Sequence, residues 1–236
     1  MYDLLFEGVE IDARFLTLLA TRYGGPILDL GCGTGRLSIP LAKAGLDVLA
    51  LDSSDEMLGL AASKHRDQKL PVTWRLGDFR KLDLGTSRFG TVLLACDAIG
   101  HLRTDEDWRA TLGGIRRHLT RTGRLIIAAP NPRPEFLDRP GAIVGLRDTP
   151  AGPVLIVEAA QFDALGGLRR LTWLLRGPEG TSRKIVVETS VHSPAALQAR
   201  LRDAGFAIEA QYGDYDGSPP APGSPEQILI CRPDRA

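Results

Sequence analysis

Short apolar runs alternate with amphipathic segments along residues 27–130. The runs are "ILDLG", "DVLALD", "VTWRLGD", "GTVLLAC" and "GRLIIAA", each rich in branched aliphatic residues. The segments 36–44, 53–65 and 105–119 between them have the capping residues and apolar spacing of helices. Strands this apolar, separated by helices, predict a parallel sheet covered by helices on both faces. The first half of the chain therefore predicts an α/β fold.

The pattern changes after residue 130. A stretch rich in proline and glycine over 130–153 predicts an irregular connection. Three strand-like runs follow without helices between them, over 154–162, 168–176 and 184–192, and the turn sequences "ALGG" and "GPEG" separate them. In the third run, Ile185, Val187, Thr189 and Val191 would lie on one face of the strand, and the more polar residues between them on the other. This alternation is typical of a strand with one buried face. These runs predict an antiparallel meander added to the main sheet.

Residues 193–236 return to the first pattern. Ser193 and Pro194 have the positions of an N-cap and a first helical residue, and "AIEAQYG" and "EQILICR" read as two further strands. The meander would then be an insertion into one α/β domain, folded over the open end of the sheet as a lid or forming a dimer surface.

Composition narrows the class of protein. Hydrophobic residues make up 43% of the 236 positions and charged residues 25%, as in ordinary globular proteins. Acidic and basic residues balance at 29 each, so no global positive field favours a nucleic-acid partner. No apolar run approaches the roughly 20 residues of a membrane-spanning helix, and the N-terminus lacks a signal-peptide pattern. We expect no membrane partner.

The cysteines point to a compartment. Cys32, Cys96 and Cys231 lie far apart in the sequence, cannot all pair, and show no spacing of metal ligands. We therefore expect no metal site and a reducing, cytoplasmic location.

The segment "ILDLGCGTGR" has the character of a ligand-binding loop. Gly31, Gly33 and Gly35 allow a tight turn and a close backbone approach to a ligand. A dinucleotide fingerprint would have its third glycine at the position of Arg36. Asp29, directly before the loop, would repel a pyrophosphate. The loop therefore favours a cationic ligand.

Two further strands also end in acids. Asp52 ends the second strand, where a carboxylate can accept both hydroxyls of a ribose. Asp78 follows the third strand and can accept from an exocyclic amine, and Phe79 can stack on a purine. Acids at three successive strand ends predict a site for a positively charged nucleoside without phosphate.

With these motifs in order, residues 20–130 resemble the class I S-adenosylmethionine-dependent methyltransferases. The matching segments are "LDLGCGTGR", "LALD" followed by "SSDEML", "LGDF", "TVLLACDAIGHL" and "GRLIIAAP". The later part is similar to bacterial small-molecule methyltransferases, including sugar N,N-dimethyltransferases of antibiotic pathways. The resemblance implies a Rossmann-like domain of residues 1–135 and 193–236, mostly parallel with an antiparallel last strand, and an inserted β subdomain at 150–192.

The resemblance also implies the cofactor and its contacts. S-adenosylmethionine would be the methyl donor and S-adenosylhomocysteine the product. Asp29 and the glycine loop would hold the methionine end, with Tyr2 at its carboxylate and the backbone around Cys96 at its amino group. The full set of implied cofactor residues is Tyr2, Asp29, Gly31, Cys32, Gly33, Gly35, Asp52, Ser53, Met57, Asp78, Phe79 and Cys96.

Methyl transfer from a sulfonium is an in-line displacement, in which the protein mainly positions the nucleophile and excludes water. The loop after the fourth strand should lie beside the methyl group, so Asp97 and His101 are the candidates for general base or acceptor binding. His101 titrates near neutrality, although a helix-entry residue is an equal interpretation. Many members of the family that the chain resembles have an asparagine and a serine around this segment; this chain differs from that pattern at Asp97 and Gly100.

Three residues from the second half are candidates for the acceptor pocket. His192 lies on the meander, and Tyr212 and Tyr215 lie in "YGDYDGS" near a strand end. The alternative for the two tyrosines is a turn-forming loop. A carboxylate-lined pocket would favour an amine acceptor, and a narrow apolar pocket would favour a phenol or a carbon nucleophile.

Three functions remain open from the sequence. The first is methylation of a small-molecule N, O or C nucleophile. The second is methylation of tRNA or protein, which would need a basic groove beside the site; the candidates, which resemble one solvated helix end, are Arg116, Arg117, Arg121 and Arg124. The third is a non-catalytic protein that binds S-adenosylmethionine or S-adenosylhomocysteine as a partner or sensor. A homodimer is compatible with each.

Overall fold

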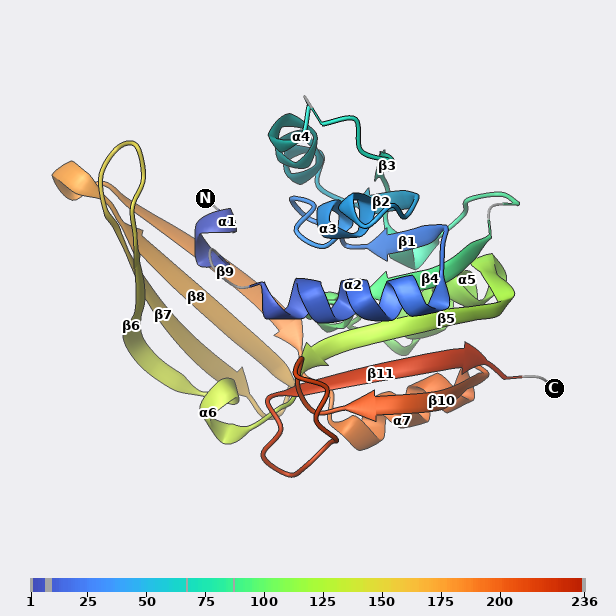
Figure 1. Ribbon diagram of the computed structural model, residues 1–236. Helices are drawn as coiled ribbons and strands as arrows, with labels where there is room; N and C mark the ends of the chain where they lie inside the picture. Colours follow the sequence, from blue (N-terminus) through green and yellow to red (C-terminus); the bar gives the residue numbers. More distant parts are fainter. Residues whose placement is uncertain (1, 7–9, 67, 87, 235–236) are drawn as a thin grey trace.

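The computed structural model describes residues 2–6, 10–66, 68–86 and 88–234, and these form two sheets (Figure 1). The larger sheet has the strand order β10-β11-β5-β4-β1-β2-β3, and only β11 runs antiparallel to its neighbours. Its strands are β1 (Ile27–Leu30), β2 (Val48–Asp52), β3 (Val72–Leu76), β4 (Phe89–Leu94), β5 (Leu119–Pro130), β10 (Phe206–Tyr212) and β11 (Glu226–Pro233). The predicted α/β fold with an antiparallel last strand is confirmed.

Helices cover both faces of this sheet. The helices are α1 (Tyr2–Leu5), α2 (Ile11–Tyr23), α3 (Ser38–Lys43), α4 (Asp55–Lys64), α5 (Asp105–His118), α6 (Pro134–Leu137) and α7 (Pro194–Asp203), with short 3₁₀ turns η1 (Phe79–Lys81), η2 (Ala98–His101) and η3 (Pro178–Gly180). One apolar cluster joins alternate strand residues to α2, α3 and α4, and the other joins the intervening residues to α5 and α7. Because both faces are covered, the central strands have no polar face, as their sequences predict.

Predicted helix starts are confirmed at three N-caps. The side chains of Ser54, Thr104 and Ser193 accept hydrogen bonds from backbone amides three residues later, at the starts of α4, α5 and α7. These bonds satisfy amides that have no partner within the helix.

The smaller sheet, named here the lid sheet, consists of β6 (Arg139–Arg147), β7 (Val154–Asp163), β8 (Leu168–Arg176) and β9 (Ser182–Ser190), all antiparallel. The three predicted meander strands are confirmed. The prediction of an irregular connection over 130–153 is wrong, because α6 and β6 both lie within it. The glycines and the proline of β6 are typical of loops, so its sequence does not indicate a strand. The structure shows an edge strand whose pairing with β7 has two register shifts, as in bulged edge strands.

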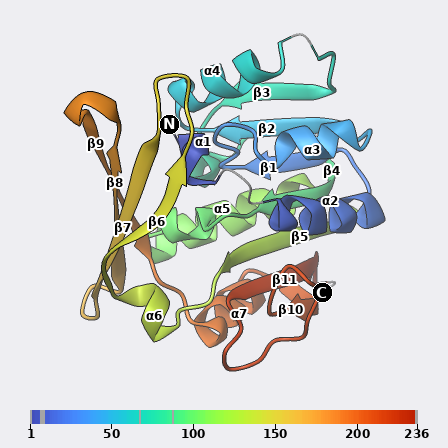
Figure 2. The ribbon, with the colours of Figure 1, turned by 60° about the vertical axis from the view of Figure 1, so that its left-hand side comes forward.

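The lid sheet stands at the carboxyl ends of the parallel strands, with α1 between the two sheets (Figures 1 and 2). Leu4 and Leu5 of α1 pack on the apolar cluster of this sheet, formed around Ile156, Trp173 and Leu175. In α/β sheets ligands bind at the carboxyl ends of the strands. The lid sheet therefore covers the edge where the sequence predicts the site.

Candidate active site

The glycine loop, residues 31–35, has the conformation that its sequence requires. Gly31, Gly33 and Gly35 have φ of +71°, +55° and +79°, in the left-handed region that glycine tolerates. A Cβ on Gly35 would lie 2.5 Å from the ring of Trp74. The loop therefore needs glycine both for its backbone angles and for its packing on β3.

Asp52 connects the end of β2 to this loop. Its carboxylate accepts from the backbone amide of Gly33 at 2.7 Å and from that of Ser54 at 2.8 Å. Ser53 lies exposed beside it, and Met57 lies half-buried in the first turn of α4. Two amides thus fix the orientation of the carboxylate, and it keeps lone pairs for hydroxyl donors such as those of a ribose.

Asp29 lies deeper than its neighbours. It is 2% exposed and accepts from the Ser38 hydroxyl at 2.6 Å. Burial raises the pKa of this carboxyl to about 6, the Ser38 hydrogen bond lowers it, and the charge of Asp52 raises it further. Asp29 thus ties the strand before the loop to α3; its predicted contact with the methionine end stays a prediction.

Arg36 is a site residue that the sequence reasoning missed. Its guanidinium donates two hydrogen bonds to Asp12 of α2, at 2.8 and 2.6 Å, and lies 2.8 Å from the sulfur of Cys96. It also lies over the ring of Phe6, with 5.3 Å to the centroid. The sequence does contain a signal for this role: Arg36 is a guanidinium directly after a loop whose other charged neighbours are acids. A guanidinium is the group that binds a carboxylate with two hydrogen bonds.

The backbone after β4 is strained. Cys96 and Asp97 have φ of 53° and 62°, and consecutive left-handed residues other than glycine concentrate at functional sites. Cys96 is solvent-exposed, yet surrounding protein raises the pKa of its thiol to about 12. The neutral thiol is a poor nucleophile, and the contact of the backbone around Cys96 with the amino group of the cofactor stays a prediction.

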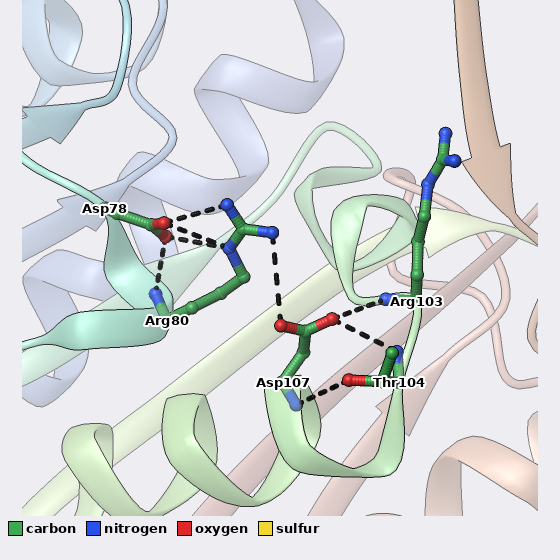
Figure 3. Close-up of polar contacts among 5 residues, drawn as sticks. All are labelled: Asp78, Arg80, Arg103, Thr104 and Asp107. Atoms are coloured by element: carbon green, nitrogen blue, oxygen red, sulfur yellow. Dashed lines mark hydrogen bonds and ion pairs between the residues drawn. The ribbon is translucent and has the colours of Figure 1, made fainter.

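Asp78 is engaged more fully than the sequence suggests (Figure 3). Its two oxygens accept from the backbone amide, Nε and Nη2 of Arg80 at 2.8 to 3.1 Å, which lowers the pKa of the carboxyl. The same guanidinium lies 3.9 Å from Asp107, which closes the capping box of α5 with Thr104. An adenine amine would have to share Asp78 with Arg80, whereas the ring edge of Phe79 lies against Gly31.

The two catalytic candidates point to different surroundings. His101 is exposed, and its charged neighbours are Arg103, Asp52 and Arg80; desolvation, then Arg103, lowers its pKa. It therefore lies on the side of the predicted ribose.

Asp97 instead faces the lid sheet. It accepts from Thr189 of β9, and burial raises the pKa of its carboxyl to about 7 against the opposing effects of Thr189 and Arg169. The cavity beside Asp97 and Thr189 measures about 10 Å³, room for about one water. Gly100 explains this contact, because a Cβ there would lie 2.6 Å from that of Thr189. Asp97 thus joins the lid sheet to β4.

The acceptor candidates separate onto two faces of the large sheet. His192 packs edge-on against Trp108 of α5 at 4.9 Å between centroids, and burial lowers its pKa to about 4. Tyr212 and Tyr215 pack instead around Phe15 of α2, at 5.3 and 6.3 Å. The structure therefore groups the two tyrosines and places His192 elsewhere.

Glu226 is the second residue that the sequence reasoning missed. It begins β11, and it accepts a hydrogen bond from the Tyr215 side chain. Burial, then the charges of Asp214, Asp97 and Asp12, raises the pKa of its carboxyl to about 7. The acids predicted for the site follow the carboxyl ends of parallel strands; because β11 is antiparallel, its amino end lies at the same edge of the sheet.

The arginines of the predicted basic groove lie far from the candidate site. The arginines proposed for a basic groove lie at the end of α5 and the start of β5, at the opposite edge of the sheet, where Arg124 pairs with Glu209 at 2.7 Å. The side chain of Tyr2 lies outside the described residues. Over the described ranges, no three potential metal ligands gather, and no helix combines the length and apolarity needed to cross a membrane.

Comparison with known proteins agrees with this geometry. Residues 27–123 match a family model described as a methyltransferase domain. The chain is 30% identical over 232 residues to the cypemycin N-terminal methyltransferase of a Streptomyces species, covering 97% of this chain and 93% of that protein. It is 28% identical over 232 residues to dTDP-3-amino-3,6-dideoxy-alpha-D-glucopyranose N,N-dimethyltransferase of Streptomyces fradiae, covering 92% and 86%. The solved CcbJ methyltransferase from Streptomyces caelestis is similar with a TM-score of 0.86, at 25% identity over 95% of this chain and 90% of that one.

Proposed function

The chain belongs to the S-adenosylmethionine-dependent methyltransferases, and we propose that it methylates the nitrogen of a small-molecule amine. S-adenosylmethionine is the methyl donor of the family. The sequence leaves the acceptor atom open among nitrogen, oxygen and carbon. The proposal commits to nitrogen because of the charges around the end of β4.

The observation that carries the proposal is the number of carboxyl groups at this edge. Asp97 and Glu226 both have pKa values of about 7, raised chiefly by burial, and Asp12 and Asp214 lie near Glu226. Carboxylates held in a desolvated place are expensive unless a cation accompanies them. A protonated amine is such a cation, whereas a phenol or a carbon acid is not. Two relatives are named as methyltransferases of an N-terminus and of an amino sugar, which supports the same choice.

The chain's residues fit the cofactor in three places. The glycine loop permits close approach of a ligand, Asp52 can accept ribose hydroxyls, and the Arg36 guanidinium can pair with a carboxylate. Bound S-adenosylmethionine supplies an electrophilic methyl group on a cationic sulfur. We propose that the loop, Asp52 and Arg36 orient it, together with Asp29, Asp78 and Phe79 as the family resemblance implies. His101 and Asp97 stay candidates for catalysis.

The acceptor class is tested with isotope-labelled S-adenosylmethionine and a panel of small amines, phenols and carboxylates. We expect label on amines and none above background on phenols. Label confined to phenols or carboxylates would overturn the proposal. Tight binding of S-adenosylhomocysteine without transfer to any compound would instead support the non-catalytic alternative.

The lid sheet bears on the oligomeric state. Four large apolar side chains of β6 and β9 are at least 44% exposed: Ile143, Val144, Leu146 and Val186. A homodimer through this sheet and a cytoplasmic location stay predictions. Sedimentation analysis of the wild type and of Ile143→Ser with Leu146→Ser tests the first: a dimer that becomes a monomer supports it, and a wild-type monomer excludes it.

A further inference from the structure

We infer that Glu226, held by Tyr215, binds the ammonium form of the acceptor and removes its proton before methyl transfer. This inference rests on the proposed amine acceptor. It assigns a catalytic group to the amino end of β11, two strands away from the loop where catalysis is predicted from the sequence.

The register of the sheet places Glu226 at the right edge. In the parallel pair, Leu94 of β4 lies beside Ile127 of β5, and after β4 the Asp97 backbone amide donates to the Ala128 carbonyl at 3.4 Å. In the antiparallel pair, Pro130 lies opposite Glu226. Pro130 lies two residues beyond Ala128, so with neighbouring strands about 4.8 Å apart the Glu226 backbone lies roughly 12 Å from that of Asp97. The charges of the two carboxyl groups still act on each other, so a small amine between Cys96 and Glu226 would lie within that distance.

The face of the sheet is also right. Glu226 alternates with Ile228 and Ile230, whose side chains belong to the apolar cluster that includes α2. On this face Tyr215 contacts Phe15 of α2, and the charged or polar groups that act on Tyr215 include Glu226, Cys96, Asp12 and Arg36. The tyrosine thus connects Glu226 to the place where Arg36 and Cys96 meet.

Glu226 is surrounded by acids and one hydroxyl. The groups that act on it are Asp214 of its own loop, Asp97 after β4, Asp12 of α2, and Tyr215. Asp12 is matched by Arg36, and Asp97 is held by Thr189 with Arg169 nearby. Asp214 accepts from the Tyr215 backbone amide, and Glu226, unlike Asp12 and Asp97, has no cationic side chain among its described interactions. A bound ammonium would supply that charge.

The proton step is balanced within the site. An N–H bond of the ammonium breaks, an O–H bond forms on the Glu226 carboxylate, and the nitrogen keeps the electron pair. The Tyr215 hydroxyl donates one hydrogen bond to the carboxylate and stabilises its ionised form before the transfer. The free amine then has the lone pair required for the displacement, and the proton leaves to solvent from Glu226 after product release.

The test compares Glu226→Gln with Glu209→Gln, a matched change on β10, where Glu209 pairs with Arg124. The substrate is an amine that the wild type methylates and that stays protonated between pH 6 and 8. We expect Glu226→Gln to lower kcat/KM by about 100-fold, the usual size of a general-base contribution. It should also abolish the rise of kcat/KM with pH near 7, and Glu226→Asp should restore part of the rate.

Binding gives a readout independent of turnover. In the complex with S-adenosylhomocysteine, calorimetry should show at least tenfold weaker binding of the amine by Glu226→Gln, with unchanged affinity for S-adenosylhomocysteine itself. Wild-type rate, pH profile and amine affinity in Glu226→Gln would overturn the inference while leaving the amine proposal intact. A wild type that methylates no amine would overturn both.

Discussion

The two sides of the active site treat their carboxylates differently. On the cofactor side, named for the glycine loop with Asp52 and Asp78, these two acids accept from backbone amides or from Arg80, and the exception is Asp29, buried behind the loop with a pKa of about 6. On the acceptor side, named for Asp97, Tyr215 and Glu226, burial raises the pKa of both carboxyls to about 7.

This difference follows from what each side must do. A site that binds the same cofactor in every cycle gains from groups already oriented in the free protein. A site that must take a proton gains from a group whose pKa lies close to the working pH, although burying that group lowers stability. The contrast predicts that substitutions on the cofactor side weaken binding or folding, whereas one on the acceptor side makes the protein more stable.

The largest expected effect is the loss of Arg36. Arg36→Met leaves Asp12, 5% exposed, without its guanidinium, and breaking such a buried pair costs about 3–5 kcal/mol. The free energy of unfolding, from urea titration at pH 7.5, measures this. The double variant Arg36→Met with Asp12→Leu should recover most of it, because both charges are gone. A single variant as stable as the wild type would show that this pair does not hold the cofactor side.

The next effect is on cofactor affinity. Asp52→Ala removes the carboxylate that joins β2 to the loop, and we expect S-adenosylhomocysteine to bind at least tenfold more weakly, about 1.4 kcal/mol or more. The matched control is Asp47→Ala, an exposed acid directly before the same strand at its other end. Calorimetry compares the two, and equal affinities would remove Asp52 from the cofactor site.

The third effect has the opposite sign. The pKa of Glu226 is raised from its ordinary 4.5 to about 7, so above pH 7 the folded state holds a charge that the unfolded state solvates better. Glu226→Gln should therefore stabilise the protein at pH 8 by about 1–2 kcal/mol, less than the full shift implies because the group is partly solvated. The gain should shrink as the pH falls and vanish near pH 4.5. Thermal melts at both pH values measure it; destabilisation at pH 8 would contradict the account.

The smallest effect concerns the junction with the lid sheet. Thr189→Val removes the hydrogen bond that lowers the pKa of Asp97, so that pKa should rise above its value of about 7. We expect a loss of about 0.5–1 kcal/mol in stability at pH 8 and a smaller loss at pH 5, where Asp97 is protonated in both proteins. Carboxyl NMR titration follows Asp97 directly, and an unchanged pKa would exclude this role for Thr189.

The sequence predicted the sheet well because local and global signals agree there. Apolar runs such as "VLAL" predict strands that are buried on both faces of a parallel sheet. Ser54 and Ser193 mark helix starts because their side chains accept hydrogen bonds from backbone amides of the first turn. The edge strand β6 escaped prediction because its pairing partner, β7, supplies what its glycine-rich sequence does not show. Order along the chain is visible in a sequence, but a pairing partner is not.

The sequence predicts those site residues that come directly at or after the carboxyl end of a parallel strand. Asp52 and the glycine loop do, and the structure joins them by a hydrogen bond. Arg36 finds its role through Asp12 on another helix, and Glu226 through the reversed direction of β11. No fixed sequence spacing marks the pairing of Arg36 with Asp12 or the place of Glu226, because each arises only when distant segments of the chain meet at one edge of the sheet.

The most direct test of the account uses one acceptor that offers a choice. An aminophenol of suitable size carries both an amine and a phenol, and transfer of a ¹³C-methyl group from labelled S-adenosylmethionine places the label on one of them. The carbon chemical shift of the product distinguishes an N-methyl from an O-methyl group. The account predicts an N-methyl signal in the wild type that is strongly reduced in Glu226→Gln. An O-methyl product, formed equally by both proteins, would contradict it.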